Sequence, residues 1–94
     1  MGAAPELPGQ DLVDAGVRDL AAGRETCEAL LVSMARTRLR AVGIDVPRSD
    51  VDRPSHRLYR LLAAEDPRTA HSRYNALTRR LVSFAHAADH ARPR

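Results

Sequence analysis

This chain of 94 residues lacks several features, and each shortage excludes a class of protein. Its single cysteine cannot form an internal disulfide, which fits a reducing compartment. No apolar run approaches the roughly 18 residues of a membrane span, and the first residues lack the basic and apolar regions of a signal peptide. The length suffices for one small domain and leaves no room for separate cofactor and substrate domains. We therefore expect a single cytoplasmic domain without membrane contact or small-molecule cofactor.

Aromatic residues and lysine are also scarce. Tyr59, Tyr74 and Phe84 are the only aromatic residues, tryptophan is absent, and all 15 basic residues are arginine. Alanine, with 16 positions, and leucine, with 11, dominate the apolar set. These unbranched side chains lose little rotamer freedom in a helix, so the composition favours helix over strand. A core of such small groups would gain from the apolar surface of a second copy.

Charge is distributed unevenly along the chain, although the net charge is only +3. Residues 1–35 hold six acidic residues against two arginines, a balance of −4, while residues 36–94 hold 13 arginines against six acidic residues, a balance of +7. Such asymmetry is found in proteins that bind nucleic acid or an acidic partner. It also arises when an acidic first helix lies against basic helices of the same molecule, and we favour this second explanation.

Hydrophobic periodicity and end signals predict four helices. Gly23 should end the first helix, Ser55 should cap the third, and Asp66 followed by Pro67 should start the fourth. The predicted helices cover residues 10–22, 25–42, 55–65 and 67–90, between a flexible lead-in (1–10) and a frayed tail (91–94), with a loop at 43–54. Four helices with short or medium connections predict an all-α, single-domain antiparallel four-helix bundle over residues 11–90.

The last helix has the clearest pattern. Its apolar residues recur at spacings of 4, 3, 4, 3 and 4, and they fall within about 80° of arc. They are Ala70, Tyr74, Leu77, Leu81, Phe84 and Ala88. Polar residues lie nearly opposite, namely Arg79, Ser83, His86 and His90. We expect the apolar stripe to face the core and the polar stripe to face solvent.

The polar stripe contains a candidate catalytic pair. Arg79 and His86 lie about 10.5 Å apart along the helix axis and about 20° apart around it. An imidazole can act as general acid or base near neutral pH, and a guanidinium can stabilise phosphoryl charge. Metal-free RNA cleavage needs such a pair. The simpler interpretation, which we favour, is a solvated helix face.

A basic cluster is the main candidate for nucleic-acid contact. It consists of Arg36, Arg38, Arg40, Arg53, Arg57 and Arg60. The sequence shows no phosphate-binding glycine loop, helix-turn-helix spacing or aromatic stacking platform beside it. Positive charge alone gives weak, salt-sensitive binding. We expect Tyr59 and Tyr74 to serve core packing, and the polar tip of each ring could form a hydrogen bond between the two helices.

Two further patterns suggest metal or thiol chemistry. His86 and His90 share a helical face and could chelate zinc, but only four residues follow them to supply another ligand, so we predict no metal site. Cys27 lies on the apolar face of the second helix, which favours a buried structural thiol over a nucleophile.

Several short segments together resemble the HEPN domains, small all-helical modules of prokaryotic toxin–antitoxin pairs that also occur beside nucleotidyltransferases. The segments are Ala21–Gly23, Glu28–Val32, Leu39–Gly43, His56–Leu62 and the Arg-x(4–6)-His spacing of Arg79 or Arg80 with His86. The resemblance covers about residues 11–90. Active members usually place a polar residue directly after the motif arginine, whereas Leu81 follows Arg80 here. The resemblance therefore implies a non-catalytic member.

We accordingly expect a non-catalytic helical interaction module that acts through homodimerisation or a protein partner such as a nucleotidyltransferase. One alternative is a metal-independent RNA-cleaving toxin that uses Arg79 or Arg80 with His86. Another is a basic adaptor that binds nucleic acid through the arginine cluster without cleaving it.

Overall fold

Helices and their connections account for all of residues 7–91, the part of the chain that the computed structural model describes. The five helices are α1 (Gln10–Ala21), α2 (Cys27–Met34), α3 (Arg36–Ala41), α4 (Pro54–Glu65) and α5 (Ala70–Ala91). This confirms the predicted all-α single domain. The predicted lead-in and tail lie largely outside the described residues. None of the described helices is long and apolar enough to cross a membrane.

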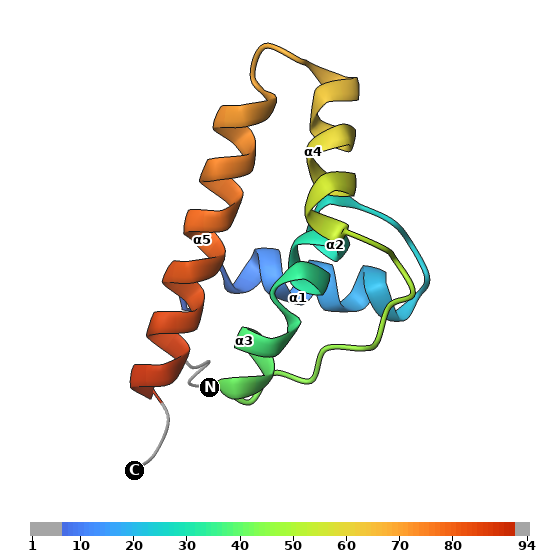
Figure 1. Cartoon of the computed structure of the whole chain (residues 1–94). Helices are drawn as coiled ribbons and strands as arrows, with labels where there is room; N and C mark the ends of the chain where they lie inside the picture. The colour runs from blue at the N-terminus through green and yellow to red at the C-terminus, as the bar shows by residue number, and fades with distance from the viewer. Residues whose placement is uncertain (1–6, 92–94) are drawn as a thin grey trace.

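The helices α4 and α5 form an antiparallel hairpin (Figure 1). The prediction that α5 starts at Pro67 is wrong, because residues 67–69 form a turn and the helix begins at Ala70. Asp66 organises this turn: its Oδ1 accepts a hydrogen bond from the Arg68 N–H at 3.0 Å. Aspartate followed by proline is as typical of a β-turn as of a helix start. The tight turn leaves Ala70 fully buried.

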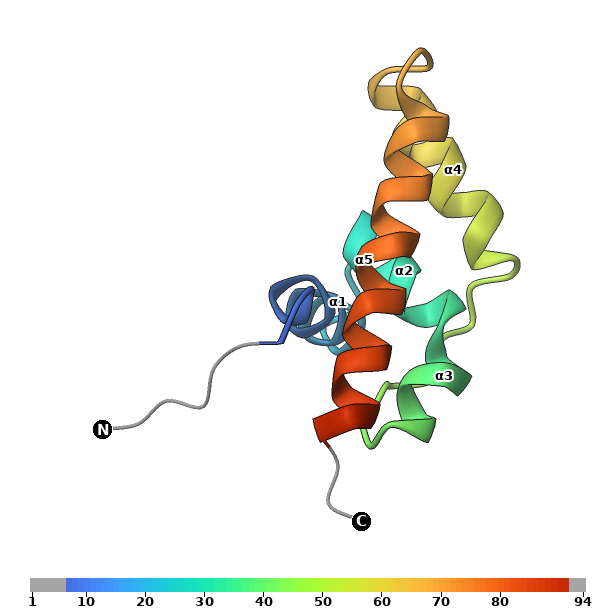
Figure 2. The ribbon, with the colours of Figure 1, turned by 90° about the vertical axis from the view of Figure 1, so that its left-hand side faces the viewer.

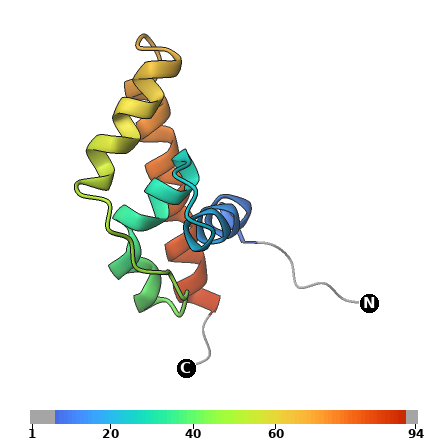
Figure 3. The ribbon, with the colours of Figure 1, turned by 90° about the vertical axis from the view of Figure 1, so that its right-hand side faces the viewer.

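The single helix predicted over residues 25–42 is divided in two. Thr26 caps α2, so the helix begins at Cys27, and Ala35 departs from helical geometry (φ −102°, ψ 14°) between α2 and α3. Beyond this break Leu39 is fully buried, and Arg36 Nε donates to the Val46 carbonyl at 3.0 Å. Figure 3 shows the loop that returns from α3 to α4. These long-range contacts accompany a bend that local helix propensity does not signal.

The first helix packs on α2 and crosses α5. Figure 2 views α1 nearly end-on while α5 runs down the picture, so the two helices cross steeply. Gly16 allows α1 to approach α2 closely, because a Cβ there would lie 2.5 Å from the Glu28 carbonyl oxygen. As predicted, α1 ends before Gly23, which has φ 76°, and the Arg24 N–H donates to the Asp19 carbonyl. This is the hydrogen-bond pattern of a glycine-terminated helix.

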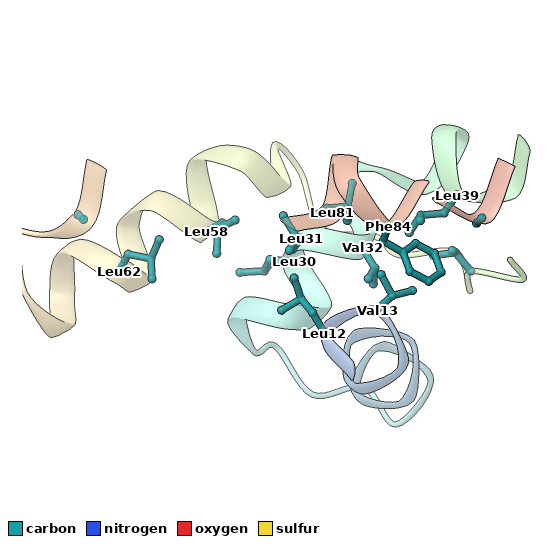
Figure 4. Close-up of a cluster of buried hydrophobic side chains, with 13 residues drawn as sticks. Leu12, Val13, Leu30, Leu31, Val32, Leu39, Leu58, Leu62, Leu81 and Phe84 are labelled. Carbon is teal, nitrogen blue, oxygen red and sulfur yellow. The ribbon is translucent and has the colours of Figure 1, made fainter. Parts of the chain in front are cut away.

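Every helix contributes to one hydrophobic cluster (Figure 4). Its largest fully buried side chains include Leu30 and Leu31 from α2, Leu39 from α3, and Leu58 and Leu62 from α4. The α5 stripe faces this core as predicted: Ala70, Leu81, Phe84 and Ala88 are buried, and Tyr74 and Leu77 are partly buried against the cluster. The prediction that Ser55 caps α4 is wrong, because Arg53 occupies the N-cap position and Pro54 is the first helical residue.

Ion pairs join the acidic N-terminal part to the basic remainder. Arg80 Nη2 of α5 lies 2.9 Å from Asp11 Oδ1 of α1. Arg57 Nε of α4 donates to Glu25 Oε1, in the loop between α1 and α2, at 2.6 Å. These contacts support the interpretation that part of the acidic charge in the N-terminal region is paired with arginines of the same molecule.

Candidate anion-binding cleft

A cleft of about 900 Å³ lies beside α4. Its volume is in the range of small-ligand sites. Four lining residues carry basic side chains, namely the three arginines Arg53, Arg57 and Arg60 and the imidazole of His56. Two are aromatic, Tyr59 and Tyr74, and the lining also includes Asp52 and Ser55. The cleft therefore combines several cationic groups with two rings in one concave surface.

The register of α4 explains why these cationic groups lie together. Arg60 follows His56 by four residues and Arg57 by three, so these three share one face of α4, and Arg53 occupies the N-cap position directly before the first turn. Leu58 projects from the opposite side and is fully buried in the core. Burial of that apolar side fixes the rotation of the helix, and the basic side must then face outward.

Arg53 has an unusual backbone. Its φ of 51° is the only positive value among non-glycine residues in the described part of the chain. Left-handed geometry is unfavourable for a residue with a Cβ. The Arg53 carbonyl accepts hydrogen bonds from the amides of His56 and Arg57 at 3.0 and 3.1 Å, so it anchors the first turn of α4. Strained residues of this kind are concentrated at functional sites.

An aromatic pair forms part of the cleft. The ring centroids of Tyr59 and Tyr74 are 6.1 Å apart and the ring planes are inclined by 59°. This geometry is typical of favourable tilted aromatic contacts. Tyr74 is partly buried against the core, whereas Tyr59 is 40% exposed. The expectation that Tyr59 serves core packing is therefore wrong. The two tyrosines do lie next to each other across α4 and α5, but they meet through a contact between their rings.

The cationic groups of the cleft differ in their partners. Arg57 pairs with Glu25, and both side chains are substantially exposed to solvent. The side chains of Arg53 and Arg60 have no ion-pair or hydrogen-bond partner among residues 7–91. Asp52 is the only acidic residue in the lining. Two unpaired guanidinium groups are thus available to an anionic ligand.

The structure divides the arginine cluster predicted from the sequence. Arg53, Arg57 and Arg60 meet at the cleft, whereas Arg36 binds the Val46 carbonyl and supports the loop. Arg38 and Arg40 are exposed on α3 and do not line the cleft.

The candidate catalytic pair lies elsewhere, on the outer face of α5. Arg79 and His86 are exposed, as is His90. Arg80 Nη2 donates to both Asp11 carboxylate oxygens, at 2.9 and 3.2 Å, and this hydrogen bond lowers the pKa of Asp11. Arg80 is therefore already engaged by a carboxylate. Within residues 7–91, no group of three or more histidine, cysteine or acidic side chains is placed to hold a metal ion.

Cys27 lies at the start of α2, partly buried against the core. Burial raises the pKa of its thiol, and the negative charges of Glu65 and Glu28 act in the same direction. A raised thiol pKa lowers the thiolate fraction at neutral pH, which agrees with a structural role.

Sequence reasoning missed the contribution of the tyrosines to this site. Tyr59 lies within the basic run of α4, between His56 and Arg60, and this position is a local signal that it borders the same face. Tyr74 reaches the cleft only because α5 packs against α4, which no local pattern reveals.

Comparison with known proteins adds no assignment: no family model, curated protein or solved structure matches the chain.

Proposed function

We propose that this protein is a non-catalytic helical interaction module that binds a nucleic-acid strand through the α4 cleft. The observation that carries the proposal is the gathering of Arg53, Arg57, Arg60 and His56 around an exposed tyrosine in one cleft. Arginine suits this role because its planar guanidinium forms paired hydrogen bonds to phosphate oxygens. The proposal combines two of the hypotheses drawn from the sequence, the non-catalytic interaction module and the basic nucleic-acid adaptor.

The HEPN resemblance is compatible with this proposal. The His-led segment His56–Leu62, one of the segments that resembles the family, forms most of α4 and contributes to the cleft. A HEPN-like antiparallel bundle, acting as a homodimer or beside a nucleotidyltransferase, is the corresponding architectural proposal. Light scattering of the purified protein tests the homodimer, since a monomer at all concentrations would contradict it.

The ribonuclease alternative has less support. It requires Arg79 or Arg80 to act with His86, yet Arg80 is bonded to Asp11 and all three residues lie outside the cleft. Under our proposal, His86→Ala leaves binding unchanged and the parent protein does not cleave the bound strand.

A matched pair of arginine substitutions tests the proposal. Arg60→Gln removes an unpaired cleft cation, and Arg79→Gln removes the same charge from an exposed site on α5. We expect Arg60→Gln to weaken binding of fluorescein-labelled oligouridylate about tenfold at low salt, because one charge-assisted contact contributes about 1.5 kcal/mol. The slope of log affinity against log salt should fall by about 0.7. Fluorescence anisotropy measures both quantities.

The Arg79→Gln variant should bind like the parent protein. Circular dichroism checks that both variants keep their helical content. Equal losses in the two variants would show that net charge and not the cleft governs binding, and absent binding by the parent protein at low salt would remove the proposal.

A further inference from the structure

The cleft offers more than positive charge. Tyr59 is the one large hydrophobic side chain that is exposed in the described part of the chain, and it lies among the cationic groups. An exposed ring does not gain the free energy that burial of its apolar surface would provide. A ligand with its own flat apolar face would cover the ring and provide that gain. Phosphate or carboxylate groups alone would leave the ring uncovered.

The ring is also held in place. The Tyr74 ring contacts it in a tilted arrangement, with 6.1 Å between the ring centroids, and Tyr74 is itself partly buried against the core. Because Tyr74 comes from α5 and Tyr59 from α4, the contact between the two helices orients the exposed ring. A supported ring loses less conformational entropy when a flat ligand stacks on it than a freely rotating one.

One cation precedes this ring along the chain and another follows it. Arg53 occupies the N-cap position of α4 and Arg60 is adjacent to Tyr59 in sequence, and all three residues line the cleft. A strand whose base covers the ring would therefore have its flanking phosphates near unpaired guanidinium groups. Base stacking combined with a cationic track is the general mode of single-strand binding.

On this basis we propose that the cleft selects single-stranded nucleic acid, with a base stacked on Tyr59 and phosphates bound by Arg53 and Arg60. This inference rests on the proposed function, because it names the ligand class of the same cleft. In a duplex the base faces are already stacked on one another and are unavailable to the ring. An acidic peptide would satisfy the arginines without covering the tyrosine.

The test compares two substitutions at Tyr59. Tyr59→Leu keeps an apolar side chain but removes the ring, and Tyr59→Phe keeps the ring. Stacking of one base on an aromatic side chain changes affinity about 5- to 150-fold. We expect that loss for Tyr59→Leu with labelled oligouridylate, and a change within about twofold for Tyr59→Phe. Binding of inorganic polyphosphate, which has no bases, should be the same in both variants and the parent.

Spectroscopy gives an independent measure. The chain has no tryptophan and only two tyrosines, so tyrosine emission can be observed directly. Stacking of uracil on Tyr59 should quench part of this emission in the parent protein. In the Tyr59→Leu variant, the emission of the remaining tyrosine, Tyr74, should not change when oligouridylate is added.

The outcomes separate the two proposals. If oligouridylate, its duplex with oligoadenylate and polyphosphate all bind equally, and Tyr59→Leu loses nothing, the single-strand inference is wrong while polyanion binding by the cleft stands. If none of these polyanions binds at low salt, the proposed function is wrong as well. Preference for polyglutamate over oligouridylate would overturn both, since it would identify an acidic protein as the ligand.

Discussion

Arg53 combines an unfavourable backbone conformation with a charge at the edge of the cleft. Its φ of 51° lies in the left-handed region, which costs an ordinary L-residue about 1–2 kcal/mol. A glycine would adopt this conformation without that cost. The arginine side chain has no ion-pair or hydrogen-bond partner among residues 7–91, so no polar contact of the side chain itself offsets the strain. Under the proposed function, a phosphate contact provides a reason for an arginine at this position.

Replacing Arg53 with glycine should therefore separate stability from binding. We expect Arg53→Gly to raise the free energy of unfolding by up to about 1 kcal/mol, because the left-handed strain is removed. Oligouridylate binding should weaken about tenfold, because a phosphate contact is lost. Urea denaturation and fluorescence anisotropy measure the two effects.

Arg53→Lys is the matched control for charge, and it should lose less binding than Arg53→Gly, with little change in stability, because it keeps the positive charge but not the paired guanidinium hydrogen bonds. A glycine variant that is less stable than the parent would contradict the strain argument, and one that binds equally well would contradict the assignment of Arg53 to the ligand.

At the scale of the helices, Thr26 connects the end of α1 to the start of α2. Its Oγ1 accepts a hydrogen bond from the Ala29 amide at 3.1 Å and donates one to Asp19 Oδ2 at 2.8 Å. Asp19 also accepts from Arg24 Nε at 3.1 Å. The Thr26 hydroxyl, followed by Arg24, holds the pKa of the Asp19 carboxyl below its usual range. One hydroxyl thus caps a helix and stabilises a carboxylate.

Thr26→Ala should lower the free energy of unfolding by about 0.5–2 kcal/mol near neutral pH, the usual effect of losing an N-cap side chain. The penalty should shrink as the pH falls. A lowered folded-state pKa means that Asp19 stabilises the fold above the unfolded-state carboxyl pKa and that this contribution disappears as the pH falls through the folded-state value. The bond to Ala29 is independent of this titration, so part of the penalty remains in acid.

Urea denaturation of both proteins from about pH 7 down to about pH 2 measures this change. Thr26→Ser keeps both hydroxyl bonds and should follow the parent at every pH. A Thr26→Ala penalty that stays constant over the range would show that the bond to Asp19 contributes nothing to stability.

The helices also show which boundaries can be predicted from sequence. The core stripe of α5 was predictable because its apolar residues repeat over many turns, from Ala70 to Ala88. The start of α5 was not, because Asp66 and Pro67 are equally suited to a turn. The break at Ala35 had no local signal, since alanine is the best helix former and the bend accompanies long-range contacts of Leu39 and Arg36.

The candidate site is a property of the whole molecule. Helical spacing alone could place Arg57 and Arg60 on one face of a helix, but only the fold shows that Arg53 and Tyr74 join them. Conversely, sequence proximity grouped Arg36 with these residues, although its side chain supports the loop at Val46. Charge patterns therefore predicted which arginines gather near α4, and tertiary packing added Tyr74 to them.

Packing also predicts how stability is distributed over the molecule. Helix α2 contacts α1, α3, α4 and α5, and Leu30, Leu31 and Val32 are at most 1% exposed. Helix α3 has six residues, of which Leu39 alone is buried. Because segments with few buried apolar contacts open locally at lower free energy, α3 should open without the rest of the fold.

Amide hydrogen exchange measured by NMR should therefore find the slowest amides at residues 30–32 and faster exchange throughout α3. In urea the exchange of α2 should follow global unfolding, whereas that of α3 should depend weakly on urea, as expected for local opening that exposes little surface. Leu39→Ala provides the control, because loss of its buried side chain should accelerate exchange in α3 more than in α4. Equal protection of α2 and α3 would mean that the two helices unfold as one unit, despite the break at Ala35.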